Sequence, residues 1–89
     1  MIKTTTTISN KLGLHARASA KLTKLAGSFP CEVWMSRADR RVNAKSIMGV
    51  MMLAAGIGSE VVVETSGERE QDAMDAILAL IRDKFGEGE

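Results

Sequence analysis

The stretch Glu60-Val61-Val62-Val63-Glu64-Thr65 is the most strand-like segment of this 89-residue chain, because β-branched residues favour extended backbone. Gly56-Ile57-Gly58 precedes the segment and Gly67 follows it, and glycines at both ends are typical of turns. The sequence therefore predicts a strand at 60–65 with sharp limits. The architecture depends on which elements lie on either side of it.

Three further segments have strand character. Residues 2–8 are rich in threonine and isoleucine and contain neither glycine nor proline. Residues 31–35 alternate between apolar and other side chains, although Trp34 interrupts the pattern. A turn at residues 38–39 leads into a short strand around residues 41–43.

Three segments show the periodicity of helices. Residues 16–26 place alanines and leucines on one apolar stripe, and residues 47–53 form a short candidate helix. Residues 68–85 form the longest candidate, which Thr65 and Glu68 are able to start as a capping box. The order β-α-β-β-α-β-α favours an α+β sandwich of two layers, with the helices covering one face of a sheet.

Composition limits the class of protein. The mass of 9.6 kDa leaves room for one core, so we expect residues 1–89 to form a single domain. The longest uncharged stretch, residues 47–58, is too short to cross a bilayer, and no apolar run follows the first residues as in a signal peptide. The lone Cys31 permits no internal disulfide, so we expect a cytoplasmic protein.

The net charge of +1 conceals an uneven distribution. Residues 1–45 contain nine basic and two acidic side chains, whereas residues 46–89 contain three basic and nine acidic ones. Such a division indicates a surface that meets an anion or an acidic partner. The alternative is that solvated faces differ by chance.

His15 is the residue with the most chemical potential, because it stands directly before the first predicted helix. The free N–H groups and the dipole at a helix start disfavour a proton on the ring and attract an anion. Arg17 adds a cationic fork, and Lys11, Lys21 and Lys24 lie in the same acid-free stretch. These residues describe a nucleophile that carries a negative group covalently. The alternative is a histidine that only caps the helix.

Other kinds of site find little support. No His or Cys residues cluster as metal ligands, and no glycine-rich phosphate loop is present, so we expect no metal and no cofactor. No carboxylate flanks His15 in the sequence, although folding can bring one close. Low aromatic content, at 3%, argues against nucleic-acid binding.

Two motifs resemble those of a known family. Gly13-Leu14-His15-Ala16-Arg17 is similar to the active-site signature of the HPr family, the histidine phosphocarriers of the bacterial sugar phosphotransferase system. Residues 45–54 resemble the second signature of that family, and the resemblance extends over the whole chain. It implies an open-faced β-sandwich, in which a four-stranded antiparallel sheet of order 1-4-2-3 carries three helices on one face.

The resemblance also implies a function. Enzyme I would pass a phosphoryl group to Nδ1 of His15, Arg17 would steady it, and an enzyme IIA domain would receive it, so the protein is a carrier rather than an enzyme. Ser46 matches a serine that a regulatory kinase phosphorylates in some members, and it also suits a helix N-cap. The alternative function is a regulatory module whose phosphorylation state controls partner proteins rather than sugar uptake.

The chain differs from the family signature at one position, and it has residues that are expected to face partner proteins. Ala18 stands where the family signature has proline, and alanine should leave the helix start intact. The resemblance implies that Ile47, Met48 and Met51 face partners, and methionine-rich surfaces suit a protein with several partners. The alternative is plain core packing. Lys21 and Lys24 should meet acidic partner surfaces. We expect a monomer that inserts into no membrane.

Overall fold

The computed structural model describes all 89 residues and has the predicted element order. The order is β-α-β-β-α-β-α, as the sequence patterns indicate, and a short 3-10 turn follows the last helix. The elements are β1 (Ile2–Thr7), α1 (Ala16–Gly27), β2 (Glu32–Arg37), β3 (Arg40–Asn43), α2 (Ile47–Met52), β4 (Glu60–Ser66), α3 (Glu70–Arg82) and the 3-10 turn η1 (Lys84–Gly86).

The sheet has the order β1-β4-β2-β3, and every neighbouring pair is antiparallel. The valine-rich β4 lies inside the sheet, where Val63 is opposite Thr4 on one side and Met35 on the other. Val61 and Val63 are fully buried. The observed order confirms the predicted one.

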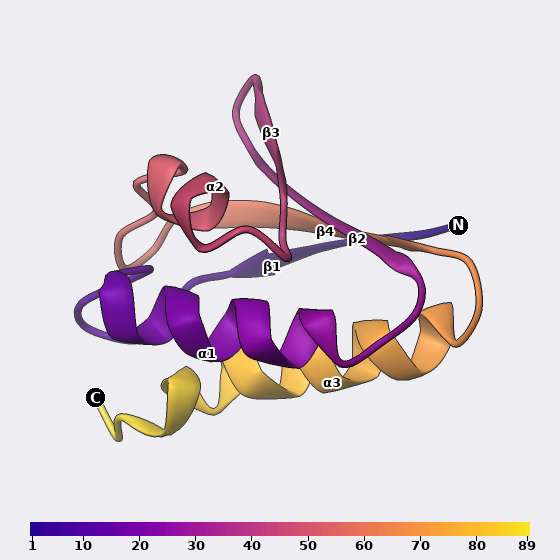
Figure 1. Ribbon diagram of the computed structural model, residues 1–89. Coiled ribbons are helices and arrows are strands. Elements are labelled where there is room, and N and C mark those ends of the chain that lie inside the picture. Colours follow the sequence, from indigo (N-terminus) through magenta and orange to yellow (C-terminus); the bar gives the residue numbers. More distant parts are fainter.

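The three helices cover one face of the sheet, and α1 and α3 lie side by side beneath it (Figure 1). Their apolar stripes and the inward side chains of the strands form one core of 20 buried residues. Leu22 of α1 and Ile77 of α3 are both fully buried there. The core thus fixes where α1 begins relative to the sheet. No helix is long and apolar enough to cross a membrane.

The other face of the sheet carries a cluster of charged and aromatic side chains. Glu64 accepts from Nε of Arg41 at 3.0 Å and lies 3.8 Å from the amino group of Lys3. The guanidinium of Arg41 also stacks 4.2 Å from the ring centre of Trp34. Trp34 therefore interrupts the alternation because it packs on the exposed face.

The last helix is shorter than its apolar period predicts. It begins at Glu70 rather than residue 68, because Arg69 adopts a left-handed backbone with φ of 63°. The capping box is wrong: no side chain caps the helix, and Oε1 of Glu70 accepts from the N–H of Gly67 instead. Positive φ at Lys84 and Phe85 ends the helical path before residue 85, yet Phe85 still reaches the core.

Candidate functional site

The loop before α1 sets the position of His15. Gly13 has φ of +64°, and a Cβ there would lie 2.4 Å from the backbone oxygen of Ala55, so only glycine fits. That same oxygen accepts from the N–H of Leu14 at 2.9 Å. A close approach between two backbone segments therefore fixes the residue directly before His15.

His15 itself caps α1 with its ring. Its backbone is extended, and Nδ1 accepts from the N–H of Arg17 at 3.3 Å. The first backbone bond of the helix runs from the N–H of Ser19 to the carbonyl of His15, at 2.9 Å. The N–H groups of Ala16 and Ala18 have no acceptor. The helix thus begins with unused donors beside the imidazole ring, as predicted, and Ala18 has not displaced its start.

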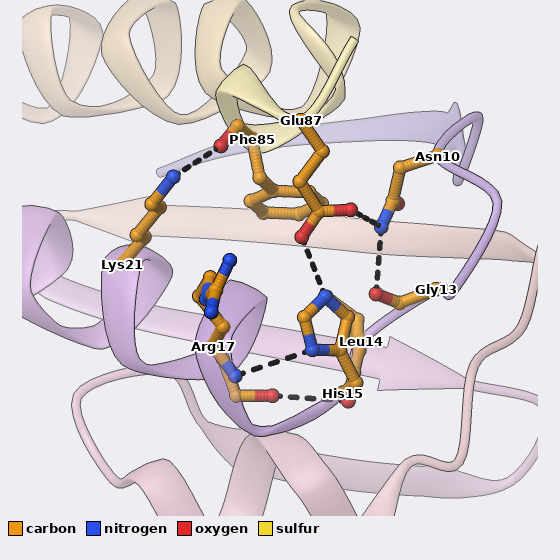
Figure 2. Close-up of polar contacts among 9 residues, drawn as sticks. Asn10, Gly13, Leu14, His15, Arg17, Lys21, Phe85 and Glu87 are labelled. Carbon is orange, nitrogen blue, oxygen red and sulfur yellow. Dashed lines mark hydrogen bonds and ion pairs between the residues drawn. The ribbon is translucent and has the colours of Figure 1, made fainter. Parts of the chain in front are cut away.

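The opposite side of the ring contacts a carboxylate that sequence reasoning missed. Nε2 of His15 lies 2.5 Å from Oε2 of Glu87, and Figure 2 shows this carboxylate above the ring. The amide of Asn10 donates to the other oxygen of Glu87 at 3.0 Å and to the carbonyl of Gly13 at 2.8 Å. Because a carboxylate only accepts, Nε2 carries a proton, and because Nδ1 accepts from the N–H of Arg17, it keeps its lone pair.

These hydrogen bonds affect the acid strength of Glu87. The donation from His15 lowers the pKa of the Glu87 carboxyl below its ordinary value of 4.5, and the amide of Asn10 adds to this effect. Partial burial opposes the shift but does not cancel it. Glu87 is therefore ionised at neutral pH and faces the ring as an anion.

The end of the chain is folded against the start of α1. The ammonium of Lys21 donates to the carbonyl of Phe85 at 2.6 Å, and the ring of Phe85 is fully buried. The N–H of Lys11 donates to the carbonyl of Glu89 at 2.8 Å. These contacts join segments about 70 residues apart. Within the sequence, the signals for these contacts are the apolar Phe85 and the two glycines on either side of Glu87.

The cationic side chains of α1 differ in whether they are already bonded to other protein groups. His15, Arg17 and Lys21 line an open hollow of about 820 Å³ together with Glu87. The guanidinium of Arg17 donates to no protein group, and neither Arg17 nor Lys24 pairs with an acid. The ammonium of Lys21 is less free to bind an anion, because it already donates a hydrogen bond to the carbonyl of Phe85. The hollow therefore offers a free guanidinium and free backbone donors to an anion on Nδ1.

The second predicted cluster lies on α2, which packs against α1. Oγ of Ser46 accepts from the N–H of Gly49 at 3.2 Å, so Ser46 is the N-cap, and it is exposed. Ile47, Met48 and Met51 are 40%, 67% and 39% exposed. Met52, which sequence reasoning left out, is also exposed. Together Ile47, Met48, Met51 and Met52 form an exposed apolar patch.

The site contains no group of His, Cys, Asp and Glu side chains arranged to hold a metal ion. Its chemical capacity is that of an oriented imidazole beside anion-binding donors. Such an arrangement is able to accept a group at Nδ1 and to bind that group's negative charge.

Comparison with known proteins places this geometry in context. Residues 2–83 match the family model described as the PTS HPr component phosphorylation site. The chain is 71% identical to the phosphocarrier protein HPr of Cupriavidus necator over the full length of both. The fold is similar to that of HPr-C-His from Thermoanaerobacter tengcongensis, with a TM-score of 0.94, 41% identity and 98% of each chain covered. An HPr dimer from the same organism, 41% identical, has a TM-score of 0.79 over 98% of this chain and 100% of that one.

Proposed function

This chain belongs to the HPr family of phosphocarrier proteins of the phosphotransferase system, and on that basis we propose that it accepts a phosphoryl group from phospho-enzyme I on His15 and passes it to enzyme IIA domains. The observation that supports this role most directly is the orientation of the imidazole. Nδ1 faces the start of α1, while Nε2 is held by Glu87.

The transfer is a displacement at phosphorus. The lone pair of Nδ1 forms the new N–P bond, and the bond between phosphorus and the donor atom of enzyme I breaks with its electron pair left on that donor atom. The N–H of Arg17, released from Nδ1, then donates to a phosphoryl oxygen together with the neighbouring N–H groups of Ala16 and Ala18. The guanidinium of Arg17 adds a charge-assisted contact.

The surroundings of His15 favour protein partners. Arg17, Lys21 and Lys24 form the exposed cationic side of α1, and the apolar patch of α2 lies on the neighbouring helix. Acidic rims with an apolar centre on enzyme I and enzyme IIA would complement this surface. The proposed working form is a single-domain protein in the cytoplasm. It is a monomer, because a carrier that visits successive partners needs this face free. Increasing salt should slow transfer.

Ser46 fits a regulatory role in the same scheme. It is exposed at the edge of the apolar patch, so a phosphate there would place two negative charges where partners dock. A serine kinase is the corresponding partner. Mass spectrometry of protein isolated under several nutrient conditions tests this point, and absence of phosphoserine in all of them would remove it.

The decisive experiment for the carrier role is phosphorylation by enzyme I and phosphoenolpyruvate. We expect one acid-labile, base-stable phosphate per chain and none in the His15→Ala variant. Serine phosphate is acid-stable, so the stability test separates the two sites. An unphosphorylated wild-type chain, or a phosphate that persists in His15→Ala, contradicts the proposal.

A further inference from the structure

Glu87 has no role in the displacement itself, yet it contacts the reacting ring. We infer that Glu87 is a positioning residue that holds Nε2–H of His15 and compensates the positive charge which the ring gains when Nδ1 bonds phosphorus. This inference rests on the proposed function, because it concerns the phosphoryl group on His15.

The first support is that the carboxylate is itself held in place. Its Oε2 faces Nε2 of His15, and its Oε1 accepts from the fully buried Asn10. The side chain of Glu87 is only 15% exposed. A carboxylate with both oxygens engaged has a fixed direction relative to the ring, unlike a freely rotating surface acid.

The second support is that the chain end cannot easily swing away. Phe85, two residues before Glu87, is fully buried, and Lys21 holds its carbonyl. Two residues after Glu87, the carbonyl of Glu89 accepts from the N–H of Lys11. Glu87 therefore sits on a segment that is anchored on both sides.

The third support comes from the charge balance of the transfer. Before it, the ring is neutral, with its proton on Nε2 and a lone pair on Nδ1. The lone pair becomes the N–P bond and the proton stays on Nε2, so the ring acquires a positive charge. An anion at Nε2 stabilises this state, as an oriented carboxylate stabilises the imidazolium of hydrolase triads. Discharge to the next acceptor restores the neutral ring.

The consequence is that Glu87 favours the phosphorylated form. Replacing the carboxylate with an amide removes the negative charge and keeps one acceptor oxygen for Nε2–H, while the new NH2 group takes the place of the oxygen that accepts from Asn10. Because a charge-assisted hydrogen bond is about twice as strong as a neutral one, we expect about a fivefold fall in the equilibrium constant for phosphorylation.

The test compares Glu87→Gln with Glu89→Gln, which removes the same charge two residues away. Glu89 is a suitable control because its side chain is 70% exposed and lies 3.8 Å from Lys11. Each variant is equilibrated with catalytic enzyme I at a fixed ratio of phosphoenolpyruvate to pyruvate, and the phosphorylated fraction is measured by ³¹P NMR. In the unphosphorylated chains, ¹⁵N NMR reports the proton on Nε2 and its exchange with water.

In support of the inference, Glu87→Gln should lower the phosphorylated fraction and expose the Nε2 proton to faster exchange, while Glu89→Gln behaves as wild type. Equal behaviour of the two variants would overturn it, since Glu87 would then only tie down the chain end. If the wild-type chain accepts no phosphoryl group, the proposed function fails and the inference fails with it.

Discussion

The starts of α1 and α2 use the same local device with different surroundings. In each, a side chain caps the helix: Nδ1 of His15 accepts from the N–H of Arg17, and Oγ of Ser46 accepts from the N–H of Gly49. Neither first turn contains an acidic residue. Both ends therefore present backbone donors near a polar side chain that is open to modification.

The difference lies in what the rest of the chain contributes. At α1, a free guanidinium and an anchored carboxylate surround an imidazole. At α2, the hydroxyl of Ser46 caps a helix with exposed methionines, and no charged side chain hydrogen-bonds to it. An exposed helix start is thus a general anion acceptor. In the proposed function, the neighbouring side chains make one cap a nucleophile and place the other beside a surface for partners.

The largest effect should come from the glycine that precedes α1, compared with the glycine inside α2. Gly13→Ala places a Cβ against the backbone of Ala55 in a left-handed conformation, so we expect a loss of about 3 kcal/mol in unfolding free energy. The matched change Gly49→Ala has no contact closer than 3.4 Å and lies inside α2, where alanine is the better helix former. Urea unfolding that shows equal losses in both variants would contradict this difference.

A smaller effect should follow from the free guanidinium at α1. Arg17→Ala removes a charge-assisted contact to the phosphoryl group, so we expect its rate of acceptance from enzyme I to fall about 10- to 100-fold. Lys24→Ala is the control, because it removes one cation from the same helix farther along the chain. Rapid-quench kinetics at fixed ionic strength should separate them. A similar loss of rate in both variants would mean that Arg17 acts through long-range electrostatic attraction of enzyme I rather than through a contact with the phosphoryl group.

The cap of α2 should matter for stability but not for acceptance. Ser46→Ala leaves the N–H of Gly49 without its side-chain acceptor and should cost about 1 kcal/mol in unfolding free energy. The equilibrium phosphorylation of His15 should stay unchanged. Thermal unfolding and ³¹P NMR measure the two properties separately. A change in phosphorylation would show that the two helix starts are coupled.

The pair at α1 should also make stability depend on pH, which the cap of α2 does not. The pKa of Glu87 is lowered in the fold, chiefly by its hydrogen bond with His15, so its contribution is present above about pH 4.5 and is lost as the pH falls below that value. Glu87→Gln should therefore unfold with a shallower pH dependence than wild type between pH 3 and 5. Identical urea midpoints across this range would exclude the effect.

The smallest effect is expected from restoring the proline of the family signature. The N–H of Ala18 donates no hydrogen bond in the free protein, so Ala18→Pro removes only an unused donor in the first helical turn. We expect a stability change within about 0.5 kcal/mol. The phosphorylated form should lose slightly more, because this N–H is available to the phosphoryl group. Comparison of thermal unfolding in both forms checks this.

Much of the fold was accessible from local patterns. The β-branched residues of β4 favour extended backbone, and the apolar stripe of α1 repeats with the period of a helix, so local patterns determine both elements. The limits of α3 were less accessible. Arg69, Lys84 and Phe85 all have positive φ. These angles depend on how the ends of the helix pack against the core, and the spacing of apolar residues does not predict them.

The sequence by itself determined the proposed nucleophile and its immediate neighbours. His15, Arg17 and the free donors of α1 lie within four consecutive residues, so local chemistry was enough to single them out. Only the tertiary structure decided which nitrogen of His15 is free. That choice depends on Glu87, which lies 72 residues away and reaches the ring because Phe85 is buried in the core and Lys21 holds the chain end.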